Sequence, residues 1–185
     1  ADRAVRGVAV ATRRARRRPW LAHPGQVQPV GLLGVAHDVI DALPPEIQEA
    51  LPAALRALTT VRLGDEVTTV RPAPLADVAN TPAKSTLVDA LIAARLLVSD
   101  ENAEGQAVVR PAHEALLSRW PRAREIVNAN RKFLETRAQI QADARRWILD
   151  NKNPELLLPP GIRLAEGEEL MQSRREEIDE QVSAY

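Results

Sequence analysis

The hydrophobic pattern of residues 30–112 changes from helical to strand-like and back, and this order limits the fold more than any other feature of the sequence. Apolar residues recur at helical spacing from Val30 to Leu43, and a second helix is predicted from the proline pair at Pro44 onward. The run "TTVRLGDEVTTVR" that follows is rich in Val and Thr, which predicts one or two short strands. Two helices and a short β element therefore come first.

A third helix and a β-hairpin complete this unit. The stretch "STLVDALIAARLL" predicts a helix with Ser85 as its N-cap, and the hairpin is predicted at Leu97 to Ala112, where two β-prone runs flank a polar turn. This order of elements is that of a winged-helix domain, which we expect over residues 30–112. Seven apolar residues are expected in its core: Leu33, Val39, Ile40, Leu55, Leu91, Ile92 and Val109.

Residues 113–185 are expected to be a helical arm leading towards a C-terminal sensor. One long amphipathic helix is predicted from Pro121 to Leu149, too long to be covered by the winged helix alone. A proline-rich break and a last, strongly charged helix from Ile162 follow. The expected fold is mainly α with a small β component, preceded by a basic arm at residues 1–29.

Composition excludes several classes of protein. The chain is 45% hydrophobic and 27% charged, and no apolar run approaches the ~20 residues that span a bilayer, so no membrane span is expected. The absence of cysteine rules out disulfides and thiolate chemistry and fits a cytoplasmic location. Because the chain begins at Ala1 without an initiator methionine or a signal peptide, we expect it to be a piece of a longer protein.

Charge is unevenly distributed, although the formal net charge is zero. Residues 1–24 hold seven arginines and one acid, whereas residues 166–180 hold seven acids and two arginines. Phosphate or nucleic-acid contact is therefore a candidate role for five residues of the basic arm: Arg13, Arg14, Arg16, Arg17 and Arg18. A solvated tail is the simpler interpretation, because Trp20 is the only aromatic residue in this arm.

A winged-helix DNA-binding regulator is the alternative function. Its third helix would have to read base edges and phosphates, yet the charged residues there are Lys84, Asp89 and Arg95. Nucleic acid is for this reason not the expected partner.

No motif for catalysis occurs in the sequence. A phosphate loop, a paired-histidine zinc motif and a nucleophile elbow are all missing. "HEALL" begins like a zinc motif but has Leu117 in place of the second histidine, so no metal site is expected. We expect the chain to be non-catalytic.

Three stretches together resemble one family. They are "ARLLVSD", "VVRPAHEALLSRWPRAREIVNANRKFLETRAQIQADARRW" and "LLLPPGIRLAEGEEL". The region from Gly31 to Tyr185 is similar to the segment that follows the nucleotide-binding core in bacterial STAND NTPases of the type that carries C-terminal WD-repeat propellers. Residues before Gly31 do not share this resemblance.

The resemblance implies a regulatory role. STAND proteins are signal-transducing ATPase switches, so this chain would couple nucleotide state to sensor input and oligomerisation. ADP or ATP would be bound by a nucleotide-binding domain outside this chain, and the chain itself would hold no cofactor. The implied partners are that domain and a WD-repeat sensor.

His113 and Glu114 are the candidate nucleotide-sensing residues that the resemblance implies. In the related NB-ARC proteins, a histidine in a Met-His-Asp motif contacts the ADP β-phosphate. Here "PAHEA" has Ala112 in place of Met and Glu114 in place of Asp. The other interpretation is structural, with His113 capping its own helix or packing beside Trp120.

Overall fold

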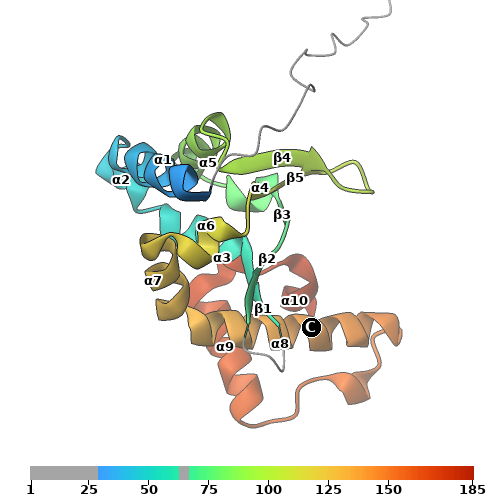
Figure 1. The fold of residues 1–185 in the computed structure, drawn as a ribbon. Coiled ribbons are helices and arrows are strands. Elements are labelled where there is room, and N and C mark those ends of the chain that lie inside the picture. The colour runs from blue at the N-terminus through green and yellow to red at the C-terminus, as the bar shows by residue number, and fades with distance from the viewer. Residues whose placement is uncertain (1–28, 63–66) are drawn as a thin grey trace, which may run out of the picture.

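The computed structural model describes residues 29–62 and 67–185. Helices predominate and strands are few, which confirms the expected fold class at that level. In Figure 1 the first helices and the larger sheet form the upper part of the molecule, and the C-terminal helices form the lower part.

Three helices open the described chain: α1 (Pro29–Asp41), α2 (Pro45–Gln48) and α3 (Leu51–Ala57). The first agrees with the sequence prediction. The second predicted helix is instead divided into α2 and α3. Pro52 lies in the first turn of α3, where its missing N–H costs no intrahelical hydrogen bond, so the sequence favours a new helix start at this point.

The strands form two separate antiparallel sheets. In the first, β1 (Thr59–Val61) pairs with β2 (Thr68–Val70), which confirms two short strands in the Val- and Thr-rich run. In the second, the spatial order is β3-β5-β4, with β3 at Ala73–Pro74, β4 at Leu97–Glu101 and β5 at Ala107–Pro111. The pairing of β4 with β5 confirms the predicted hairpin.

The turn of this hairpin follows from its polar residues. Gly105 has a φ of 75°, a conformation that residues with a Cβ rarely adopt. The Asn102 side-chain oxygen accepts the backbone N–H groups of Glu104 and Gln106 at 3.1 and 2.8 Å. Glu104 itself lies exposed at the tip.

Between β3 and β4 in the sequence lie α4 (Leu75–Val78) and α5 (Pro82–Ala93). The prediction that Ser85 caps the third helix was wrong by one turn. Thr81 is the N-cap, and its side-chain oxygen accepts the Lys84 N–H at 3.3 Å. Pro82 suits the first helical position, so the helix begins before Ser85.

One continuous apolar core joins these elements, and the predicted core residues lie in it. Ile40, Leu55, Leu91 and Val109 are buried. Leu33, Val39 and Ile92 are partly buried and pack against the same core. Further buried members come from α1, α3, α4 and α5 and from the residues that follow α3 and α5: Ala36, Leu51, Ala54, Leu58, Val78, Leu87, Val88 and Leu96.

The predicted long helix is interrupted. The chain forms α6 (Ala115–Arg119), α7 (Pro121–Ala129) and α8 (Arg131–Leu149), with a break at Asn130. The Asn130 side chain donates to the Ile126 carbonyl at 2.7 Å, a local bond by which asparagine competes with the helical backbone pattern. The 19-residue α8 is about 29 Å long at ~1.5 Å per residue, and it packs against β1, α9 and α10.

The C-terminal region forms two helices rather than one. After a 3-10 turn at Pro154–Leu156, α9 (Ile162–Arg174) ends in a second 3-10 turn, η2 (Arg175–Glu177), and α10 (Glu180–Ala184) follows. A small apolar cluster of Ile140, Ala144, Ile178, Val182 and Tyr185 attaches this end to α8.

The main core extends beyond the expected domain boundary at residue 112. This core also contains Leu116, Leu117, Trp120 and Ala123, so α6 and the start of α7 pack against the described residues from α1 to β5, which we call the sheet-containing part. Within the described ranges, no helix is both long and apolar enough to cross a membrane.

Candidate functional site

His113 lies at the corner between β5 and α6. Both His113 and Glu114 are exposed, whereas Ala115, Leu116 and Leu117 after them are buried in the core. The corner is therefore anchored by the apolar side of α6 and presents its two polar residues outward. The expected helix start at His113 is shifted, because α6 begins at Ala115 and has only five residues.

The His113 imidazole caps its own short helix. Its Nδ1 atom accepts the backbone N–H of Ala115 at 3.2 Å. An Nδ1 atom that accepts a hydrogen bond carries no proton, so the neutral ring holds its proton on Nε2. Because the residue is exposed, Nε2–H can donate to a group outside the chain while Nδ1 continues to cap. The capping and sensing interpretations are thus geometrically compatible.

Glu114 borders a surface groove of about 310 Å³ between β2 and α6–α7. Its polar lining includes Thr69, Ser118, Arg124 and Asn128. His113 does not line this groove, so the two candidate residues point to different surroundings. The five candidate arginines at 13, 14, 16, 17 and 18 lie outside the described residues.

A second polar site, which sequence reasoning missed, surrounds the C-terminal end of α3. We call it the arginine cluster and define it as Arg56, Arg71, Arg137 and Arg174. Arg137 is 1% exposed, and its Nη2 donates to the carbonyls of Arg56 and Thr59 at 2.8 and 2.7 Å. Arg71 Nε donates to the Ala57 carbonyl at 2.9 Å. The Arg56 and Ala57 carbonyls lie at the negative end of α3, where guanidinium groups are favourable, and the Thr59 carbonyl belongs to the adjoining strand β1.

Glu177 reaches this cluster from the other end of the chain. Its carboxylate forms a two-point contact with Arg56, with a distance of 2.8 Å from Nε to Oε2. Both side chains are only 12% exposed, so this pair is less screened by water than a surface pair. The pair joins η2 to α3 across 121 positions of sequence.

Asn130 and Phe133 also contact the arginine cluster, at the junction where α3, α8 and α9 meet. The Asn130 side-chain oxygen accepts Arg174 Nη1 at 2.7 Å and Arg56 Nη1 at 3.4 Å. The Phe133 ring lies 4.4 Å from the Arg174 guanidinium carbon and 5.4 Å from that of Arg137. Cation–π contact therefore orients two of the four guanidiniums.

Burial is the main cause of the shifted pKa values in the arginine cluster. It lowers the pKa of Arg137 to about 10, with the positive charge of Arg71 next in effect and Glu177 acting in the opposite direction. Burial also lowers the pKa values of Arg71 and Arg174. All three groups remain protonated at neutral pH, so the cluster is a concentration of partly desolvated positive charge.

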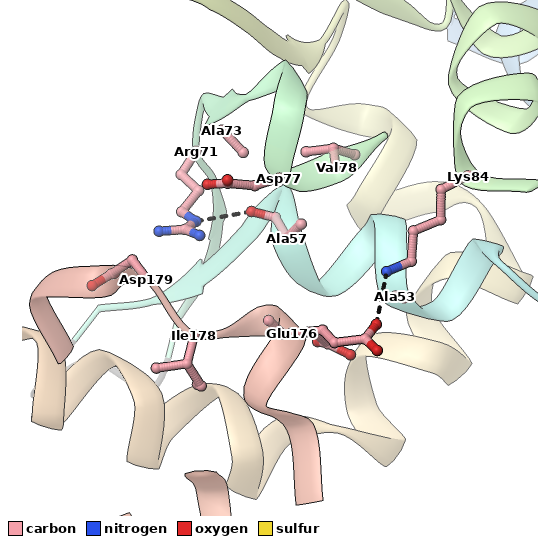
Figure 2. A pocket seen from close by; sticks show the side chains of 11 residues that line it. Ala53, Ala57, Arg71, Ala73, Asp77, Val78, Lys84, Glu176, Ile178 and Asp179 are labelled. Carbon is pink, nitrogen blue, oxygen red and sulfur yellow. Dashed lines mark hydrogen bonds and ion pairs between the residues drawn. The ribbon is translucent and has the colours of Figure 1, made fainter. Parts of the chain in front are cut away.

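Figure 2 shows the small pocket beside the cluster, with Arg71 bonded to the Ala57 carbonyl and Lys84 approaching Glu176. Its volume is about 60 Å³, whereas pockets for small-molecule ligands are typically ~300 Å³ or more. A nucleotide does not fit there in this conformation. Across residues 29–62 and 67–185, no group of three or more His, Cys, Asp or Glu residues could hold a metal ion.

Comparison with known proteins identifies the class. Residues 25–155 match the family model described as novel STAND NTPase 1. The chain therefore belongs to this family of STAND-class NTPases. Comparison with curated proteins gives no match, and comparison with solved structures gives none.

Proposed function

We propose that this chain is a non-catalytic regulatory module of a bacterial STAND NTPase, coupling nucleotide state to a C-terminal sensor and to oligomerisation. The observation that carries the proposal is the family match, which spans both the sheet-containing part and α6–α8. One apolar core connects α6 and α7 to the sheet-containing part, so a displacement of α6 or α7 would also disturb that part.

The sheet-containing part is proposed to be a winged-helix domain. In its support, β3 is followed by the helices α4 and α5 and by the β4–β5 hairpin, and the three strands are arranged in the order β3-β5-β4. This order of elements is the one expected of a helix-turn-helix with an attached hairpin. α8 and the C-terminal helices would then lead to the sensor, which we propose is a WD-repeat propeller in the cytoplasm.

ADP or ATP is proposed to bind to a separate nucleotide-binding domain of the parent protein. This chain has no phosphate loop in its sequence, and the transfer of a phosphoryl group needs positioned phosphates and a metal-holding acid. We expect purified chain to show no ATP hydrolysis above background. Turnover that persists after contaminating ATPases are removed would contradict the proposal.

His113 is proposed to donate from Nε2 to the bound ADP. A hydrogen bond to a charged phosphate contributes roughly 1.5–3 kcal/mol, or about ten- to a hundredfold in affinity. In the full-length protein, His113→Ala should therefore weaken ADP binding by that factor and raise signal-independent activation. Glu114→Ala should have a smaller effect.

Melting temperature and ADP affinity should be measured on the same His113→Ala protein. Loss of the bond to the Ala115 N–H alone would cost about 0.5–2 kcal/mol of stability. A lower melting temperature with unchanged ADP affinity would show that His113 serves only as a cap. His113→Asn is a matched variant, because an asparagine side chain preserves capping but shortens the reach towards ADP.

The alternative, a DNA-binding regulator, receives little support from α5. Lys84, its basic residue, contacts Asn80 at 2.9 Å and approaches Glu176 at 3.9 Å. A gel shift repeated at increasing salt tests the alternative, because phosphate contacts lose affinity steeply with salt.

A further inference from the structure

Positive charge exceeds negative charge around the C-terminal end of α3. The arginine cluster brings four guanidiniums together, and Arg145 adds its positive field at Arg71. Three carboxylates act on these groups: Glu177, Asp179 and, at Arg71, Asp77. Asp179 is also committed elsewhere, because it accepts the Val182 N–H and the Gln141 side-chain amide. The partly buried site thus lacks full charge compensation.

One donor in the site has no partner. Arg137 Nη1 is buried and forms no hydrogen bond within the part of the chain that the structure describes. A buried guanidinium N–H without an acceptor is costly, and native structures usually provide a protein, water or ion partner. This donor and the excess charge both indicate that the site can accept more anionic oxygen than Glu177 supplies.

We propose that the arginine cluster is a binding site for a phosphate group, and that the Glu177 carboxylate occupies this site in the present structure. Guanidinium groups bind carboxylate and phosphate through the same two-point geometry. A phosphate near neutral pH carries a larger negative charge than a carboxylate and offers more acceptor oxygens, so it compensates the cluster more completely. Arg56, Arg174 and Arg137 are the residues that bind it.

Binding of phosphate displaces Glu177 and loosens the C-terminal segment. Glu177 is the last residue of the three-residue turn η2, and the next residue, Ile178, packs on α8 with Val182 and Tyr185. Replacing the Glu177 contact therefore removes the bond of η2 to α3, and leaves the apolar cluster and the bond of Asp179 to Gln141. The site lies on different elements from His113 and does not depend on the function proposed above.

Calorimetric titration with inorganic phosphate tests the proposal, with the ionic strength kept constant by NaCl. Glu177→Gln removes the competing charge with little change of shape, and this variant should bind phosphate at least about tenfold more tightly than the unchanged chain. Glu104→Gln is the matched control, because it removes the same charge from the exposed hairpin tip; its phosphate affinity should equal that of the unchanged chain. Adding Arg174→Gln to Glu177→Gln should reverse the gain.

Equal phosphate affinity in Glu177→Gln and Glu104→Gln would overturn the proposal. A melting curve of each variant establishes that it is folded; if Glu177→Gln unfolds, Glu177→Ala, which also removes the competing charge, takes its place with the same expectation. Hydrogen exchange gives an independent measurement on the unchanged chain: saturating phosphate should speed exchange at residues 175–182. Phosphate binding without faster exchange there would contradict displacement of Glu177.

A second titration distinguishes free phosphate from phosphate carried on a nucleotide. If ATP and inorganic phosphate bind Glu177→Gln with similar affinity, and both lose it with Arg174→Gln, the phosphate group alone is recognised. Tighter binding of ATP that is lost with Arg174→Gln assigns the site to a nucleotide phosphate. Binding of either ligand that is insensitive to Arg174→Gln would refute the site.

Discussion

The sheet-containing part is stabilised mainly by apolar burial, whereas the junction at which the arginine cluster joins α3 to the C-terminal helices is held by polar bonds. Around α5 the core is apolar, and Leu87, Val88 and Leu96 are fully buried. At the junction, buried Arg137 bonds to backbone carbonyls and Arg56 bonds to Glu177. Apolar burial is not directional and stabilises by area, whereas guanidinium bonds require one geometry. The first region therefore supplies most of the stability, and the second fixes how the C-terminal helices are placed.

The largest effect is expected in the apolar core. Leu87→Ala removes a fully buried side chain at the centre of α5 and should lower the free energy of unfolding by about 2–5 kcal/mol. Denaturant unfolding followed by circular dichroism measures this loss. Ile162→Ala, at a residue that is 80% exposed, is the control and should change stability by less than about 0.5 kcal/mol.

The next effect separates polar bonding from packing at the junction. Arg137→Ala removes the bonds to the Arg56 and Thr59 carbonyls and leaves a cavity, so it should lower the free energy of unfolding by about 2–4 kcal/mol. Arg137→Met retains the packing volume without the charge. Since a buried charge is costly to desolvate, this variant should lose less than half as much as Arg137→Ala.

A larger loss of unfolding free energy in Arg137→Met than in Arg137→Ala would contradict this expectation, because it would mean that the packing volume of the side chain contributes little to stability at this position. Both variants should be measured at low and high salt. Salt should change the difference in stability between the two variants only slightly, since Arg137 is 1% exposed.

The smallest losses of stability are expected from removing one helix cap in each of the two regions. Thr81 caps α5 through a single bond to the Lys84 N–H, so Thr81→Ala should cost about 0.5–1 kcal/mol. Asp179 caps α10 through the Val182 N–H and also accepts the Gln141 amide at 2.7 Å, so Asp179→Ala should cost more, about 1–2 kcal/mol. Thermal unfolding of both variants under identical conditions gives the ranking, and a smaller loss for Asp179→Ala would show that its bond to Gln141 contributes nothing.

Local sequence predicted the sheet-containing part well because its signals are local. The Val- and Thr-rich runs of β1 and β2 and the polar turn before Gly105 are visible within a few residues. The Ser85 cap was wrong because Thr81 and Pro82 form an equally local start signal one turn earlier. The break at Asn130 was missed because neither Pro nor Gly marks it; a side chain that bonds to its own helix ends α7.

The arginine cluster could be found only in part. Arg137 follows Leu134 by three positions and precedes Ile140 by three, so a charge on the buried face of α8 was visible in the sequence. Its partners were not visible. The Arg56–Glu177 pair joins positions 121 residues apart, and nothing in the charged C-terminal run distinguishes Glu177 from the acids beside it.

The bend at Asn130 determines the direction in which α8 leaves the main core. On one side, α7 contributes Ala123 to the main core; on the other, α8 extends about 29 Å towards Trp147 and Tyr185, whose rings lie 5.7 Å apart. A rotation of about 10° at this joint would shift the far end of α8 by about 5 Å, roughly the rise of one helical turn. Because α9 and α10 pack on α8, the geometry at Asn130 therefore sets where the C-terminal helices lie relative to the main core.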